Sequence, residues 1–134
     1  MADMTVSVPD DMLDLFAEPA VGHVAYTTET GQIVLFPMWV DYDGAHLLVS
    51  SPVDSKKGRA FRARPRIGVS IVSTQTMWRW LSISGRVVDI RPDEGLAFID
   101  RMSQKYVGQP YQRRTPREIF VIEIDRVGHS GNWR

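Results

Sequence analysis

The sequence contains no cysteine among its 134 residues, which excludes disulfides, thiolate catalysis and cysteine-ligated metal sites. Its longest apolar runs have the length of strands, so no membrane span is expected. The first residues, MADMTVSVPDD, are acidic and lack the positively charged, apolar pattern of a signal peptide. We therefore expect a cytoplasmic protein. The length predicts one domain, residues 1–134, with a single hydrophobic core.

Basic residues are missing from the first part of the chain. No lysine or arginine precedes Lys56, although the formal net charge of the whole chain is zero. This asymmetry is typical of a site for an anionic ligand, or of a self-complementary oligomer surface. The balanced net charge argues against a nucleic-acid-binding protein, because such a domain is usually basic overall.

Common catalytic motifs are also missing. The sequence has no G-x-S-x-G motif, no P-loop and no dinucleotide-binding glycine pattern, so neither a hydrolase nor a Rossmann enzyme is expected. His23, His46 and His129 are isolated and show no ligand spacing, so we predict no metal site.

The pattern of apolar residues predicts a mainly β protein. A short helix is expected from Pro9 to Phe16, a basic helix before Pro65, and a third helix from Pro92 to Tyr106. Alternating or continuous apolar runs predict six strands, and the first three should form a meander. Pro37 in the second strand predicts a bulge, an edge position or a point where the strand leaves its partner. Hairpin-length connections favour a closed or partly closed antiparallel β-barrel with two to three short helices. The expected strands are residues 23–28, 32–40, 46–51, 67–72, 78–90 and 118–127.

The stretch of residues 43–73 combines hydroxyl groups with a cluster of basic residues. An apolar strand ends in Ser50 and Ser51, and Lys56 and Lys57 then open a helix. Hydroxyls, free helix N–H groups and ammonium groups could together hold a phosphate. The alternative is a solvated basic helix. A second basic group has the same two interpretations, and there solvated charges are favoured; it comprises Arg101, Lys105, Arg113, Arg114 and Arg117.

Two tryptophans begin the predicted fifth strand. Alternation would place Trp78 and Trp80 on one face of this strand and Arg79 on the other. The indoles could plug a barrel end or a dimer interface, or they could form the wall of a groove for a flat ring system.

Four segments together carry a family resemblance. MWVDYDGAHLLVSS, SKKGRAFRARPRIGVSIV, MWRWLSISGRVVDI and IDRMSQKYVG follow one another in the order and spacing of the pyridoxamine-phosphate-oxidase-like split β-barrel superfamily. Within it, the chain resembles the small flavin/deazaflavin oxidoreductases of the B branch, many of which use coenzyme F420. The resemblance covers about residues 21–127. Departures from the family pattern are Ala60, where asparagine is common, and an unusually apolar segment at residues 32–36.

The resemblance implies an F420-dependent oxidoreductase that transfers a hydride to a small organic substrate. The alternatives are an FMN-binding homologue and a barrel that carries flavin or haem without turnover. No catalytic side chain is predicted, because the hydride chemistry would belong to the cofactor. The active unit would be a homodimer, with Trp78, Arg79 and Trp80 reaching the cofactor of the partner subunit. The other implied cofactor-binding residues are Pro37, Met38, Trp39, Val49, Ser50, Ser51, Lys56 and Lys57.

Overall fold

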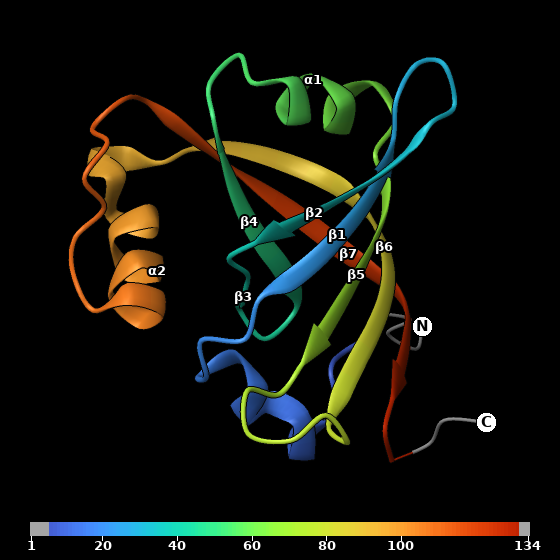
Figure 1. Ribbon diagram of the computed structural model, residues 1–134. Helices are drawn as coiled ribbons and strands as arrows, with labels where there is room; N and C mark the ends of the chain where they lie inside the picture. The colour runs from blue at the N-terminus through green and yellow to red at the C-terminus, as the bar shows by residue number, and fades with distance from the viewer. Residues whose placement is uncertain (1–5, 132–134) are drawn as a thin grey trace, which may run out of the picture.

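The computed structural model describes residues 6–131, which form one antiparallel sheet of seven strands with short helices around it (Figure 1). The strand order is β2-β1-β5-β6-β7-β4-β3. The helices are η1 (Asp10–Phe16), α1 (Lys56–Ala63), η2 (Glu94–Leu96) and α2 (Ala97–Val107). The strands are β1 (Gly22–Thr27), β2 (Ile33–Met38), β3 (Asp41–Tyr42), β4 (His46–Pro52), β5 (Arg66–Val72), β6 (Trp80–Pro92) and β7 (Arg117–His129). Within the described part of the chain, no helix is long and apolar enough to cross a membrane.

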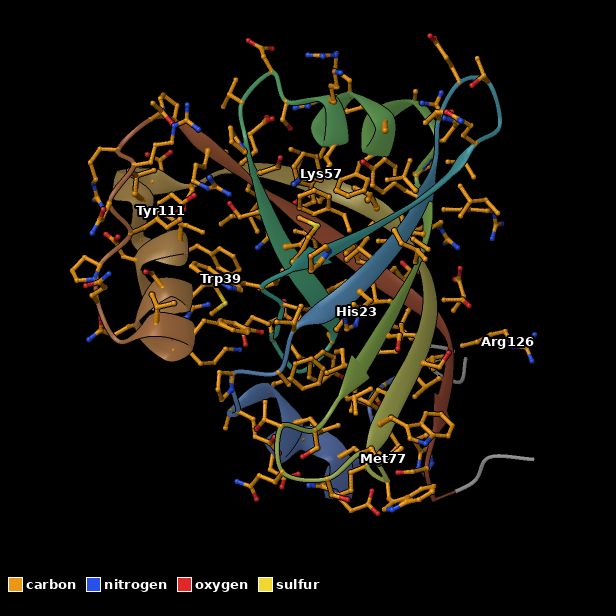
Figure 2. All side chains as sticks on the ribbon, viewed as in Figure 1. His23, Trp39, Lys57, Met77, Tyr111 and Arg126 are labelled. Carbon is orange, nitrogen blue, oxygen red and sulfur yellow. The ribbon has the colours of Figure 1, made fainter. Side chains whose placement is uncertain are left out.

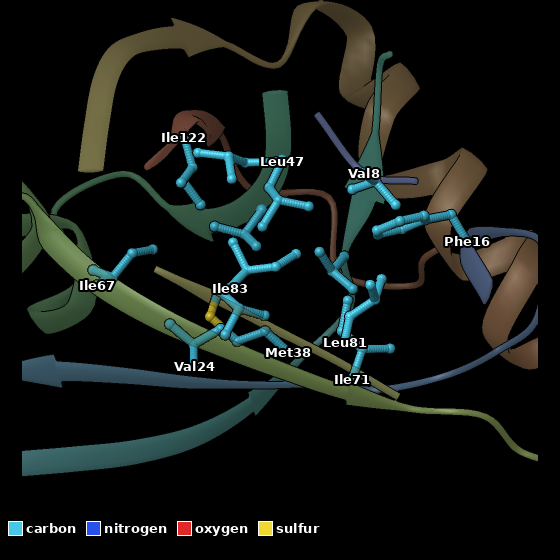
Figure 3. Close-up of a cluster of buried hydrophobic side chains, with 14 of the residues drawn as sticks. Val8, Phe16, Val24, Met38, Leu47, Ile67, Ile71, Leu81, Ile83 and Ile122 are labelled. Atoms are coloured by element: carbon cyan, nitrogen blue, oxygen red, sulfur yellow. The ribbon is translucent and has the colours of Figure 1, made fainter. Parts of the chain in front are cut away.

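The sheet curls around a core made by every second side chain of its strands. Val24, Ile83 and Ile122 come from different strands and meet inside the curl (Figure 3). Helix η1 closes one end with Met12, Leu15 and Phe16, and α1 lies at the opposite end (Figure 1). The predicted class, a mainly β barrel with short helices, is confirmed.

Strands β4 and β7 are covered on both faces. Leu47 and Val49 of β4 point into the main core, whereas Leu48 points outward into a second cluster with Phe98 and Met102 of α2. β7 contributes to the same two clusters in the same alternating way. α2 therefore packs on the outside of the β4–β7 pair, and this explains the consecutive apolar residues within each strand, at 47–49 and 119–122.

The predicted three-stranded meander is wrong. β2 pairs with β1 but not with β4; β4 pairs instead with β7 and with the short strand β3. The chain leaves the sheet after Met38, so the predicted second strand ends early, and residues 41–42, outside the predicted strands, form the short strand β3, which raises the strand count from six to seven. Pro37 lies in an edge strand, where its missing N–H removes no ladder hydrogen bond.

The starts of two predicted elements also differ. β6 begins at Trp80, so Trp78 and Arg79 lie in the preceding turn and do not alternate along a strand. Helix α2 begins at Ala97 and not near Pro92, because the backbone of Leu96 is left-handed (φ 59°). The carboxylate of Asp93 accepts hydrogen bonds from the N–H groups of Phe98 and Ile99 and so satisfies the first turn of α2.

Gly85 allows β6 to approach β7 closely. A β-bulge lies between Ser84 and Gly85. A Cβ atom at position 85 would lie 2.3 Å from the carbonyl oxygen of Glu123. Gly128, in the neighbouring strand, has its nearest non-local atom at 3.8 Å from such a Cβ.

We predict that Gly85→Ala lowers the free energy of unfolding by about 1–3 kcal/mol or more, because β6 and β7 must separate to admit the methyl group. Gly128→Ala is the matched control, and it should leave stability unchanged or raise it by about 0.4–1 kcal/mol through the unfolded state. Urea denaturation of the two variants provides the measurement. Equal effects would contradict the proposed close approach.

Candidate functional site

A cavity of about 180 Å³ lies where the end of β2, the start of α1, helix α2 and the start of β7 meet. Figure 2 shows Trp39, Lys57 and Tyr111 on this side of the molecule, between α2 and the sheet. Polar and aromatic residues dominate one part of the wall and apolar residues the rest. The lining residues are Phe36, Pro37, Met38, Trp39, Ser50, Lys57, Phe98, Ile99, Met102, Tyr111 and Arg117.

One end of the cavity is cationic. Arg117, at the start of β7, is only 9% exposed, and its Nε donates a hydrogen bond of 2.9 Å to Oγ of the buried Ser50. Lys57 lies in the first turn of α1, and its Nζ sits 3.6 Å from the ring centroid of Phe36. Among the described residues, neither cation forms an ion pair with a carboxylate.

The pKa values of both cations are lowered chiefly by burial. Burial lowers the pKa of Lys57, and the nearby charge of Arg117 lowers it further. Burial also lowers the pKa of Arg117. Two positive charges thus share a partly desolvated space, and each is less favourable there than in water. An anion bound between them would offset both the free-energy cost of burying the two charges and the repulsion between them.

The other end of the cavity is aromatic. Trp39 stacks on Tyr106 with ring centroids 5.3 Å apart and an angle of 9°, and Tyr111 meets Trp39 edge-on at 5.9 Å. The Tyr106 hydroxyl donates to the carbonyl of Ala20 (2.7 Å) and accepts from the N–H of Val40 (3.2 Å). Nζ of Lys105 donates to the Val40 carbonyl at 2.9 Å. The segment that leaves β2 is therefore held by α2, and this fixes the indole of Trp39.

The structure brings together five of the residues that the family resemblance selects. Pro37, Met38, Trp39, Ser50 and Lys57 all line the cavity. Their predicted role in binding a cofactor stays a prediction.

Three other selected residues lie next to the cavity but do not line it. Val49 points into the main core. Oγ of the buried Ser51 lies 2.6 Å from Oγ of Ser55, which caps α1 by accepting the N–H of Gly58. Lys56 is exposed at the start of α1.

The remaining three selected residues lie at the opposite end of the barrel, near η1. Trp78 is 75% exposed, and Arg79 is held by Asp14 of η1 through two hydrogen bonds of 2.7 and 3.0 Å. Trp80 pairs with Val72 across β5 and β6. Within one chain these residues are remote from Lys57. Figure 2 labels the neighbouring Met77, which lies at the opposite end of the barrel from Lys57. Their predicted role requires a second copy of the chain.

The second basic group does not behave as one unit. Arg101 and Arg114 form ion pairs with Asp41 and Asp100. Lys105 binds backbone carbonyls, and Arg117 is buried in the cavity. The prediction of solvated charges is therefore wrong for Lys105 and Arg117.

Sequence reasoning did not select six of the eleven lining residues, and Arg117 and Tyr111 are the two of these with polar side-chain groups. The available signal for Arg117 was its position directly before an alternating apolar strand. Tyr111 lies in a loop with no periodicity, and only the fold brings it near Trp39.

Comparisons with known proteins agree with the fold. A structure described as an F420 reductase has a TM-score of 0.80 and 27% sequence identity, and the match covers 90% of this chain and 98% of that one. General Stress Protein 26 from Bacillus anthracis has a TM-score of 0.67 at 14% identity, covering 90% and 91% of the two chains. HupZ from Group A Streptococcus has a TM-score of 0.62 at 17% identity, covering 91% and 93%. The last two show the fold alone.

No curated protein gives a significant match to the sequence. The family model for pyridoxamine 5'-phosphate oxidase matches residues 8–131, which is nearly the whole chain. The chain therefore belongs to the pyridoxamine 5'-phosphate oxidase family and has its split β-barrel fold.

Proposed function

We propose that the protein is an F420-dependent oxidoreductase that reduces a small organic substrate, with FMN as the alternative cofactor. The observation that carries this proposal is the cavity itself: an aromatic wall at one end and, at the other, two cations that form no ion pair among the described residues. A ligand with a flat ring and a phosphate matches both ends. The likeness to a structure described as an F420 reductase supports the deazaflavin over FMN.

The donor set fits the phosphate of such a cofactor. Lys57 and Arg117 provide positive charge, and both are partly desolvated, which strengthens their interaction with an anion. Ser50 uses its Oγ to accept from Arg117, so the hydroxyl proton remains available to donate. When bound, reduced F420 would supply the hydride. The chain would hold the phosphate with these three residues and offer Trp39 as the apolar wall for the ring.

The size of the cavity supports a site completed by a second copy. Its volume of about 180 Å³ is below the roughly 300–1,000 Å³ usual for small-molecule sites. β2 lines the cavity with Pro37 and Met38, and further along the same strand Ile33 and Leu35 are 76% and 70% exposed. An edge strand with exposed apolar side chains is typical of an interface. We therefore include a homodimer with shared cofactor sites in the proposal.

The choice between the two cofactors predicts a visible difference. A dissociable F420 should leave the purified protein colourless, and F420 added to it should then bind saturably. Tightly held FMN should instead give a yellow protein with flavin absorbance. The absorbance spectrum and a fluorescence titration with each cofactor decide between them. A protein that binds neither cofactor would contradict the proposed function.

Lys57→Met should weaken binding of F420 or FMN at least tenfold, because it removes a charge-assisted contact of about 1.5–3 kcal/mol. The same substitution should keep or raise the melting temperature of the ligand-free protein, since methionine retains the apolar stem. The sign follows from the lowered pKa of Lys57: at neutral pH its charge is less favourable in the fold than in the unfolded chain.

Lys56→Met is the matched control for this substitution, because Lys56 is the exposed neighbour on the same helix. It should change both the dissociation constant and the melting temperature very little. Equal losses of affinity in the two variants would indicate a diffuse basic surface in place of the proposed phosphate site.

The wild-type protein should be a dimer at micromolar concentration by light scattering. Leu35→Glu should dissociate it and weaken cofactor binding, because a buried unpaired carboxylate destabilises an apolar interface. Val107→Glu is the control, since Val107 is 56% exposed at the end of α2, away from β2. A wild-type monomer with full cofactor affinity would exclude the shared site.

A further inference from the structure

Tyr111 is held by its backbone in the middle of the loop of residues 108–116, between α2 and β7. Its N–H donates to Oδ1 of Asp100 at 3.0 Å, and its carbonyl accepts from Nη1 of Arg114 at 2.9 Å. Arg114 also binds Asp100 with both terminal nitrogens, at 2.7 and 3.1 Å. One ion pair thus binds both backbone polar groups of one residue. We call Asp100 and Arg114 the clamp.

The rest of the loop is fixed mainly at its ends. Gly108 closes α2 by donating its N–H to the carbonyls of Ser103 and Gln104. At the other end, the Pro116 carbonyl accepts the N–H of Val53. The clamp is therefore the anchor in the middle of the loop, and it holds the backbone from which the side chain of Tyr111 extends.

The ring of Tyr111 contacts both ends of the cavity. It meets Trp39 edge-on, with an angle of 85° between the rings, and the guanidinium of Arg117 lies 5.0 Å from its centroid. In Figure 2, Tyr111 extends from the loop towards the space that Trp39 and Lys57 face. The ring therefore forms the side of the cavity that joins the aromatic wall to the cationic end.

We infer that Tyr111 sets the width of the ring-binding part of the cavity, and that Asp100 and Arg114 are positioning residues that act through it. This inference rests on the proposed function, because it assumes a ligand that combines a ring with a phosphate. Loss of the clamp should release Tyr111 and weaken contact with a planar ring. A ringless anion needs only Lys57, Arg117 and Ser50, so its binding should not depend on the clamp.

The test compares Arg114→Ala with Arg113→Ala, a neighbour in the same loop that carries the same charge. The probes are whichever of F420 and FMN the wild type binds, and inorganic phosphate. Arg114→Ala should weaken cofactor binding about tenfold and change phosphate binding less than threefold. Arg113→Ala should change neither by more than about threefold. Asp100→Asn, which keeps an oxygen for the Tyr111 N–H, replaces Arg114→Ala if that variant does not fold.

A double-substitution cycle separates positioning from general damage to the loop. Tyr111→Ala should weaken cofactor binding about as much as Arg114→Ala, and the double variant should bind no more weakly than Tyr111→Ala alone. Additive losses, or equal losses of cofactor and phosphate affinity, would overturn the inference. If the wild type binds neither F420 nor FMN, the proposed function fails and the inference with it. If the wild type binds one of them and the Arg114 and Arg113 variants behave alike, only the inference fails.

Discussion

The antiparallel pairing of β4 with β7 is the constraint on which the rest of the structure depends. It runs from His46 opposite Glu123 to Pro52 opposite Arg117, and it brings together segments far apart in the sequence. One face of the pair forms part of the barrel core and the other face supports α2, so both faces exclude water. The same register places Arg117 beside Ser50 and starts α1 close to the cavity. A shift of one residue would exchange the two faces and separate these groups.

The cavity contains an arrangement that stability alone does not explain. Most arginines of the described chain have a carboxylate or a backbone carbonyl as partner, but Lys57 and Arg117 share a partly buried space without an ion pair. Burial and mutual repulsion lower the pKa of Lys57, so the ligand-free fold holds this charge at a free-energy cost. Perturbed cations in a cleft are typical of functional sites, where a ligand compensates the cost. A ligand anion bound as proposed would compensate this loss of stability.

Helix α2 connects the cavity to the barrel through its last turn. Lys105 and Tyr106 bind the backbone around Val40, where the chain has left β2 and has not yet entered β3. The break after Met38, the stacking of Trp39 on Tyr106 and the outward face of β4 are therefore parts of one arrangement. Lys105 and Tyr106 belong to the segment IDRMSQKYVG that carries the family resemblance, and the structure gives these two residues a physical role.

Local patterns in the sequence determined the elements and much of the cationic site. Alternating apolar residues predicted most of the strands, and Ser50 with Lys57 predicted one side of the cavity, because these features depend on neighbours in the chain. Only the tertiary structure decided the strand order, the additional strand β3 and the positions of Arg117 and Tyr111 at the cavity. Strand partners depend on which apolar faces can be buried together. The sequence pattern of β4 fits a meander as well as pairing with β7, and the packing of α2 on the outer face of β4 and β7 distinguishes the two. Arg117 lines the cavity and is not solvated, because it is buried at the start of β7 against the ring of Tyr111 from the preceding loop.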